Sequence, residues 1–419
     1  MRHLLLPLAL LGAAASAHDM VPANSQSDAI LFTHATVHTV SDGVKENTQV
    51  LIENGRIKAI GTQLEVENAR IIDAKGKHLY PGLVALDTQV GMVEISMVRP
   101  TVDTFDVGLN NAELRAQSVF NPDSEIIPTL RRNGITHAQI VPQGELLAGQ
   151  SALVNLDSWT VEDALVPTPM SLHLYWPELG GLPSKPDEKA KALEEHQKAL
   201  DDIANLFASA HAFADRKAAE PSLSHRRFEA MQPLFAGKAR LFLHLNDSRA
   251  ISEALPLVRQ YQLKAVIVGG YDAWRHADAI KEAGVAVVYP SVLSLPRHRD
   301  DNIDEAFVVP SRLAKAGIDF AIAYSGDWDA RNLPFAAGYA AANGLSKDAA
   351  LKAITLDAAK IAGVDDMGAI KEGFRANLVL AEGDILDPMS ARIQQVFIDG
   401  REIDLKTRAD QLYQKYLKR

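Results

Sequence analysis

The chain has 419 residues, of which 47% are hydrophobic and 23% charged, and its formal net charge is −10. These values are typical of a soluble globular protein long enough for a large barrel and one added domain. The acidic balance argues against nucleic acid or an anionic lipid surface as the main partner. The chain contains no cysteine, which excludes disulfides and a lipid-modified N-terminal cysteine.

Residues 1–17 predict a cleaved secretory signal peptide. Arg2 gives a basic start, residues 4–15 are apolar, and residues 15–17 have small side chains that suit leader peptidase. The apolar run is too short to span a bilayer, and the other interpretation is a buried N-terminal helix. A cysteine-free exported chain fits a bacterial periplasm. We therefore expect a periplasmic protein that begins at His18 and does not insert into the membrane.

Both ends of the mature chain predict β-structure. Residues 29–80 contain short β-rich runs, and Asn54-Gly55 between two of them is a strong hairpin signal. Residues 366–405 repeat this style, so the two segments together predict one composite β-sandwich domain. Residues 406–419 are expected to form a C-terminal helix.

Residues 81–365 alternate apolar strands with helical patterns, which indicates parallel βα units. Within this segment, residues 188–219 are charged and rich in alanine, and predict one or two exposed helices. The fold class expected is α/β, a (β/α)8 TIM barrel with the composite β domain attached. A doubly wound open sheet is the rival fold, disfavoured because no glycine-rich phosphate motif follows an early strand.

Several motifs of this barrel segment carry a family resemblance. A Pro-Gly turn leads into an apolar run that ends in Asp87-Thr88-Gln89, and further along the chain the sequence reads Leu243-His244-Leu245, Val268-Gly269-Gly270, Ser325-Gly326-Asp327 and Arg331-Asn332-Leu333-Pro334. With the β-rich ends, these motifs resemble the amidohydrolase superfamily and its imidazolonepropionase-like group. The resemblance implies a metal-dependent hydrolase whose first barrel strand ends in His-x-His.

The chain departs from that pattern at the metal-binding positions. Asp87, Thr88 and Gln89 replace His-x-His, and strand alternation would turn Asp87 and Gln89 into the barrel mouth. By resemblance, His244 matches the metal-binding histidine of strand five, and Asp327 is the nearest match to the aspartate of strand eight. Two glycines stand where strand six offers a histidine, and the bridging residue of strand four is not identifiable. The remaining histidines, among them His173 and His298, show no paired ligand spacing.

A catalytic zinc needs about three protein donors and an open position for water. His244 and Asp327 are two such donors, and Asp87 becomes a third only with an unusual backbone position. The resemblance thus leaves two alternatives for the cofactor, a single divalent metal such as zinc or no metal. The catalytic assignment is Asp327 as general base and His244 as the group that holds the oxyanion or the metal. Asp87, Gln89 and Arg331 are the candidate substrate-binding residues, with Arg331 either a carboxylate clamp or a partner of Asp329.

Two functions follow from these residues. The first is a hydrolase acting on C–N bonds, other than peptide bonds, of a cyclic amide or a similar small polar molecule. The alternative is an inactive amidohydrolase-fold protein that serves as a binding or assembly module, either as a homo-oligomer or paired with a related amidohydrolase. Fold alone does not choose between them, because one barrel hosts many functions.

Overall fold

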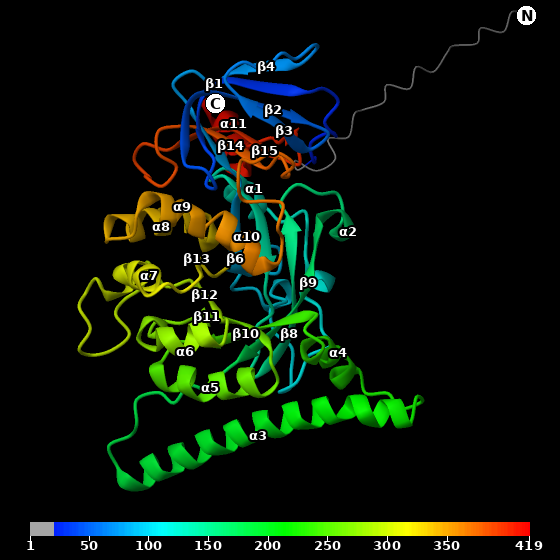
Figure 1. Ribbon diagram of the computed structural model, residues 1–419, viewed down its shortest axis with the longest axis vertical. Helices are drawn as coiled ribbons and strands as arrows, with labels where there is room; N and C mark the ends of the chain where they lie inside the picture. Colours follow the sequence, from blue (N-terminus) through cyan, green and yellow to red (C-terminus); the bar gives the residue numbers. More distant parts are fainter. Residues whose placement is uncertain (1–20) are drawn as a thin grey trace, which may run out of the picture.

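The computed structural model describes residues 21–419, so the expected signal peptide lies outside the described residues. Two eight-stranded sheets organise the chain. One is built from both ends of the chain, and the other is a barrel built from the residues between them. Figure 1 shows the small β domain at one end of the molecule and the long helix α3 (Pro186–Ala219) at the other.

The small β domain is a sheet in the order β16-β15-β14-β5-β1-β2-β3, with β4 pairing with β1. Its strands are β1 (Ile30–His38), β2 (Val44–Glu53), β3 (Arg56–Gly61), β4 (Arg70–Asp73), β5 (His78–Pro81), β14 (Leu378–Glu382), β15 (Arg392–Ile398) and β16 (Arg401–Glu402). Asn54 and Gly55 join β2 to β3 with φ angles of 51° and 74°, as a tight hairpin turn requires. Antiparallel pairing of β14 with β5 unites the two chain ends, and confirms the composite domain.

The second sheet contains the strands β6 (Leu83–Thr88), β7 (Ile135–Ile140), β8 (Leu147–Asn155), β9 (Leu165–Tyr175), β10 (Ala239–Leu245), β11 (Lys264–Gly269), β12 (Ala286–Tyr289) and β13 (Phe320–Ile322). They neighbour one another in chain order. The first and last strands meet where the Gln89 amide donates to the Gly326 carbonyl oxygen at 3.0 Å. The sheet therefore nearly closes, and the expected TIM barrel is confirmed.

Strand β8 differs from the expected pattern, because it runs antiparallel to both β7 and β9. Only residues 141–146 connect β7 to β8, and residues 156–164, with the short helix α2 (Val161–Ala164), connect β8 to β9. A parallel neighbour needs a crossover of a dozen or more residues, which these connections do not supply. The front of the barrel therefore lacks the alternating helices that its second half has.

Helices cover the second half of the barrel. They are α4 (Arg226–Phe235), α5 (Ser248–Gln260), α6 (Ala277–Glu282), α7 (Glu305–Ala316), α8 (Leu333–Ala342), α9 (Lys347–Ala353) and α10 (Leu356–Ala362), while α1 (Ile127–Arg131) precedes β7 and α11 (Arg408–Leu417) ends the chain. The expected helical stretch before β10 is the single helix α3, whose buried residues Ile203, Phe207, Ala210 and Phe213 form one apolar stripe. Within residues 21–419, no helix is both long and apolar enough to cross a membrane.

Alternate strand residues fill the interior of the barrel and set the direction of the residues above them. Phe242, Val268 and Ala323 belong to one buried apolar cluster contributed by the barrel strands. Because side chains alternate along a strand, the inward positions two residues further on are His244 on β10 and Ser325 after β13. These polar side chains form a layer above the apolar one at the carboxyl ends of the strands, the end of this fold that carries active sites.

Candidate functional site

Asp87 stands at the end of β6 in a backbone conformation that breaks the strand. Its φ angle is +56°, and the register of β6 on β7 shifts between Ala85 and Thr88. Few non-glycine residues adopt this left-handed conformation, although aspartate tolerates it better than most. Simple alternation therefore fails at Asp87, and Asp87, Thr88 and Gln89 are all buried. The unusual backbone position that a ligand role for Asp87 would require is present.

The Asp87 carboxyl group is buried next to a single hydroxyl donor. Ser325 Oγ donates a hydrogen bond to Asp87 Oδ2. Burial raises the pKa of Asp87 from 3.8 to about 6, and the Ser325 hydrogen bond only partly offsets this rise. A carboxyl group with this pKa exchanges a proton near neutral pH, as a general base must.

A chain of side-chain hydrogen bonds starts at the backbone of Asp87. The Asp87 amide donates to Gln139 Oε1 at 3.3 Å, and Gln139 Nε2 donates to Ser151 Oγ at 3.0 Å. A backbone N–H is always a donor, so the first contact fixes which end of the Gln139 amide is oxygen. Ser151 therefore accepts from Gln139 and keeps its own O–H for another partner.

That partner is His173 on β9, which in turn contacts His244 on β10. His173 Nε2 lies 2.7 Å from Ser151 Oγ, and His173 Nδ1 lies 2.8 Å from His244 Nε2. If the Ser151 hydroxyl donates to His173 Nε2, neutral His173 carries its proton on Nδ1 and donates it to His244 Nε2. Neutral His244 then carries its own proton on Nδ1. No residue within 21–419 accepts a hydrogen bond from that nitrogen, so its N–H is available to a ligand.

Both imidazoles are held neutral. Burial lowers the pKa of His244 to about 3, and burial together with the neighbouring His244 lowers the pKa of His173 well below its usual value. The Tyr175 ring stacks on His244 with centroids 4.0 Å apart and fixes the orientation of the imidazole. Burial raises the pKa of Tyr175, and the negative charge of Asp87 raises it further.

The donor set does not fit the binuclear metal centre that the resemblance implies. Asp87 and Gln89 replace the two imidazoles of strand one, and β11 ends in glycine. The facing nitrogens of His173 and His244 are engaged with each other. Zinc prefers nitrogen or sulfur donors with free lone pairs, and this arrangement uses those lone pairs in hydrogen bonds. We therefore derive no reaction step through a metal at this position.

The structure brings together some of the residues singled out from the sequence. Asp87, Gln89 and His244 lie at the carboxyl ends of strands β6 and β10 of the same barrel sheet, and Gln89 is buried. Asp327 is half-buried two residues after Ser325, and its carboxylate forms no hydrogen bond or ion pair with residues 21–419. Ser325, rather than Asp327, occupies the end of strand eight beside Asp87. The catalytic and metal-binding roles assigned to Asp327 and His244 stay predictions.

Arg331 lies outside this hydrogen-bonded group. Its guanidinium stacks over the Trp328 ring at 4.4 Å and donates to the Trp328 carbonyl oxygen at 3.0 Å, rather than pairing with Asp329. Its role as a carboxylate clamp also stays a prediction.

Four polar residues of the site were not singled out from the sequence: Gln139, Ser151, His173 and Tyr175. One signal was present, because His173 stands in Leu172-His173-Leu174, the same tripeptide pattern as Leu243-His244-Leu245. In the barrel these two strands pair in parallel, with His244 opposite Tyr175. Gln139 and Ser151 carried no such signal, because their contact depends on the reversed strand β8.

Comparison with known proteins supports the same family. The amidohydrolase family model matches residues 269–403. No curated protein matches the chain. Among solved structures, an amidohydrolase from Thermotoga maritima is 23% identical with a TM-score of 0.78, covering 90% of this chain and 99% of that one.

Two other solved structures share the fold at lower identity. An adenosine deaminase from Xanthomonas campestris with bound zinc is 17% identical, with a TM-score of 0.52 and coverage of 95% and 98% of the two chains. The N-isopropylammelide isopropylaminohydrolase from Burkholderia multivorans is 16% identical, with a TM-score of 0.51 and coverage of 90% and 98%. At these identities the likeness shows the fold alone, and the resemblance to the amidohydrolase superfamily rests on the fold and the family model together.

Proposed function

Because this chain is amidohydrolase-like in sequence and fold, we propose that it hydrolyses a C–N bond in a small polar molecule, using Asp87 and His244 in place of a binuclear metal centre. The observation that carries the proposal is the hydrogen-bond chain that runs from the Asp87 backbone to His244, together with an Asp87 carboxyl group of pKa about 6 at the end of β6. Similar folds include a deaminase and an isopropylaminohydrolase, names that denote cleavage of C–N bonds.

The proposed reaction uses one base and one donor. Asp87 takes a proton from water as the water oxygen forms a bond to the carbonyl carbon of an amide. The carbonyl oxygen becomes an oxyanion, which accepts a hydrogen bond from His244 Nδ1–H. The tetrahedral intermediate collapses as the C–N bond breaks, and the Asp87 carboxyl group returns its proton to the leaving nitrogen. The products are a carboxylic acid and an amine, which at neutral pH become a carboxylate and an ammonium ion, with no net change in Asp87.

The choice of Asp87 as base revises the role given to Asp327 by resemblance. Asp87 is buried and accepts a hydrogen bond from Ser325, whereas Asp327 has no described partner that would fix its position. Asp327, Gln89 and Arg331 remain candidates for contacts with the ligand. Buried polar groups favour a small polar ligand, because each one left unpaired costs about 1–3 kcal/mol.

A screen of substrate classes tests the proposal. Chelator-treated protein would be incubated with cyclic amides, ureides and amino-substituted heterocycles, and released amine would be followed by mass spectrometry. We expect hydrolysis of at least one class by the natural chain, loss in Asp87→Asn and His244→Ala, and retention in Asp329→Ala, whose carboxylate is exposed. Equal hydrolysis by all four proteins would contradict the assignment.

The second candidate function is a binding or assembly module without turnover. The observation in its favour is the loss of the superfamily's metal donors at the ends of β6 and β11. This alternative would be favoured if a ligand raised the melting temperature of the natural chain but not that of His244→Ala, and if no substrate class were hydrolysed. Gel filtration would then show whether the module is a homo-oligomer.

Export to the periplasm is a separate proposal, supported by the composition of residues 1–17. N-terminal sequencing of protein expressed in a Gram-negative host is expected to give His18 as the first residue. Protein that starts at Met1 would contradict export.

A further inference from the structure

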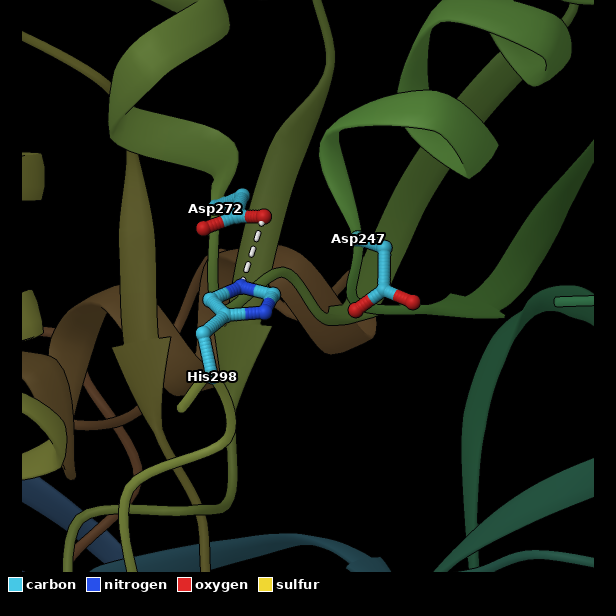
Figure 2. A group of neighbouring side chains, drawn as sticks. All are labelled: Asp247, Asp272 and His298. Atoms are coloured by element: carbon cyan, nitrogen blue, oxygen red, sulfur yellow. Dashed lines mark hydrogen bonds and ion pairs between the residues drawn. The ribbon is translucent and has the colours of Figure 1, made fainter. Parts of the chain in front are cut away.

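Three metal-ligating side chains gather outside the site described above. Asp247 follows β10, Asp272 follows β11, and His298 lies in the connection after β12, so all three come from carboxyl ends of barrel strands. One potential ligand atom from each lies within 4.8 Å of the other two. Figure 2 shows the His298 imidazole beside both carboxylates, with its Nε2 atom 3.0 Å from Asp272 Oδ2.

Each of these side chains is oriented by other groups. Asp272 is buried, and it accepts hydrogen bonds from the Ser248 amide at 3.0 Å and from Arg275 Nε at 3.3 Å. Asp247 Oδ1 accepts from Arg297 Nε at 2.7 Å, and within residues 21–419 Asp247 Oδ2 accepts no hydrogen bond. Metal-binding carboxylates are commonly oriented by neighbouring donors in this way, and Asp247 keeps its Oδ2 atom for an ion.

The charges around the group do not balance. The carboxylates joined in this network are those of Glu178, Asp247, Asp272 and Asp301. Among residues 21–419, two guanidinium groups contact them, those of Arg275 and Arg297. The four carboxylates outnumber these two guanidinium groups by two. One divalent cation would neutralise that excess.

We propose that Asp247, Asp272 and His298 bind one divalent cation, with water in the remaining positions. Two carboxylate oxygens and one imidazole nitrogen are donors that suit Mn²⁺ or Zn²⁺. The site uses none of the residues of the proposed hydrolysis, so it stands or falls independently of that proposal.

Metal binding to the full chain tests this site. After chelator treatment and dialysis, Zn²⁺ would be titrated in a calorimeter, and Mn²⁺ would be titrated with free ion counted by electron paramagnetic resonance. We expect one ion per chain in the natural protein. His298→Ala, Asp247→Asn and Asp272→Asn should each weaken binding by about tenfold or more. Circular dichroism of the metal-free variants would confirm that they are folded. If Asp272→Asn does not fold, the loss of binding in His298→Ala tests the site in its place.

Two controls fix the location of the ion. His34 and Asp73 form a similar pair on the β domain, with His34 Nδ1 3.0 Å from Asp73 Oδ1. No second carboxylate joins this pair among residues 21–419, so the His34→Ala variant should bind the ion with unchanged affinity. His244→Ala should also bind it unchanged. The proposal would be overturned if neither ion showed saturable binding. It would also be overturned if His298→Ala and Asp247→Asn both bound the ion with natural affinity, or if His244→Ala lost the ion.

Discussion

His173 Nδ1 lies 2.8 Å from His244 Nε2, so two histidines from neighbouring parallel strands share one hydrogen bond at the mouth of the barrel. In a metal-binding barrel these nitrogens would have lone pairs available for ions. Here the bond is the last link of a chain that starts at the backbone N–H of Asp87. When the Ser151 hydroxyl donates to His173 Nε2, His173 donates to His244 Nε2 and the His244 proton lies on Nδ1.

Removing the His244 imidazole should abolish the donor to the oxyanion. We expect His244→Ala to lower kcat by about 100-fold or more, the usual effect of losing one such donor, with a smaller change in KM. Steady-state kinetics on a substrate found in the screen measure this. A change in KM alone would show that His244 only binds the ground state.

Replacing Asp87 by asparagine should stabilise the protein at high pH. The folded-state pKa of Asp87 is raised from 3.8 to about 6, so its contribution to stability is fully present below pH 3.8 and is lost as the pH rises through 6. This difference corresponds to a penalty of about 3 kcal/mol at pH 8. Asparagine tolerates the φ angle of +56°, can accept the Ser325 hydrogen bond, and carries no charge.

The measurement is urea unfolding of the natural chain and Asp87→Asn at pH 8 and pH 4. The gain in the free energy of unfolding should be largest at pH 8 and should shrink toward pH 4. Asp329→Asn, at an exposed carboxylate, provides the control. A gain that is equal at both pH values would contradict burial of a titrating carboxyl group at position 87.

The same carboxyl group should control the pH dependence of turnover. Asp87 acts as a base only when it is ionised, so kcat/KM should rise with pH through about 6 and then level off. Asp87→Asn should lose both the rate and this acidic limb. If kcat/KM of Asp87→Asn still rose with pH around the same midpoint, the titrating group would be another residue.

Sequence patterns predicted the parts of this protein that depend on local periodicity. The Asn54-Gly55 hairpin is a local signal, and the βα units after residue 239 follow from apolar runs and helical patterns. The reversed strand β8 was not predicted, because its direction is set by short connections rather than by its own residues.

The site was predictable only in part for the same reason. His244 was found through its strand end and its family resemblance. Gln139 and Ser151 meet because β7 and β8 form an antiparallel pair, which the sequence did not reveal. The left-handed backbone at Asp87 also escaped prediction, since alternation along a strand assumes regular φ angles.

Truncation before Ala376 should give insoluble protein. It removes β14, whose pairing with β5 covers the edge of the N-terminal strands, and it removes Arg401, which lies 3.1 Å from the buried Asp157 carboxylate. Exposed strand edges promote aggregation. The matched control is a chain that ends at Thr407, which lacks only α11, a helix without buried residues, and should stay soluble. A soluble, cooperatively folded product from the longer truncation would show that the two segments do not form one domain.

The tautomer of His244 tests the central claim most directly, without need of a substrate. Long-range ¹H–¹⁵N spectra of protein labelled at histidine distinguish Nδ1–H, Nε2–H and doubly protonated imidazoles, and His244→Ala and His173→Ala assign the two signals. We predict that both rings are neutral and carry their proton on Nδ1 from pH 5 to pH 8, and that Ser151→Ala disturbs this state. Protonation of His244 on Nε2, or its titration near pH 6.5, would contradict the hydrogen-bond chain and with it the proposed donor.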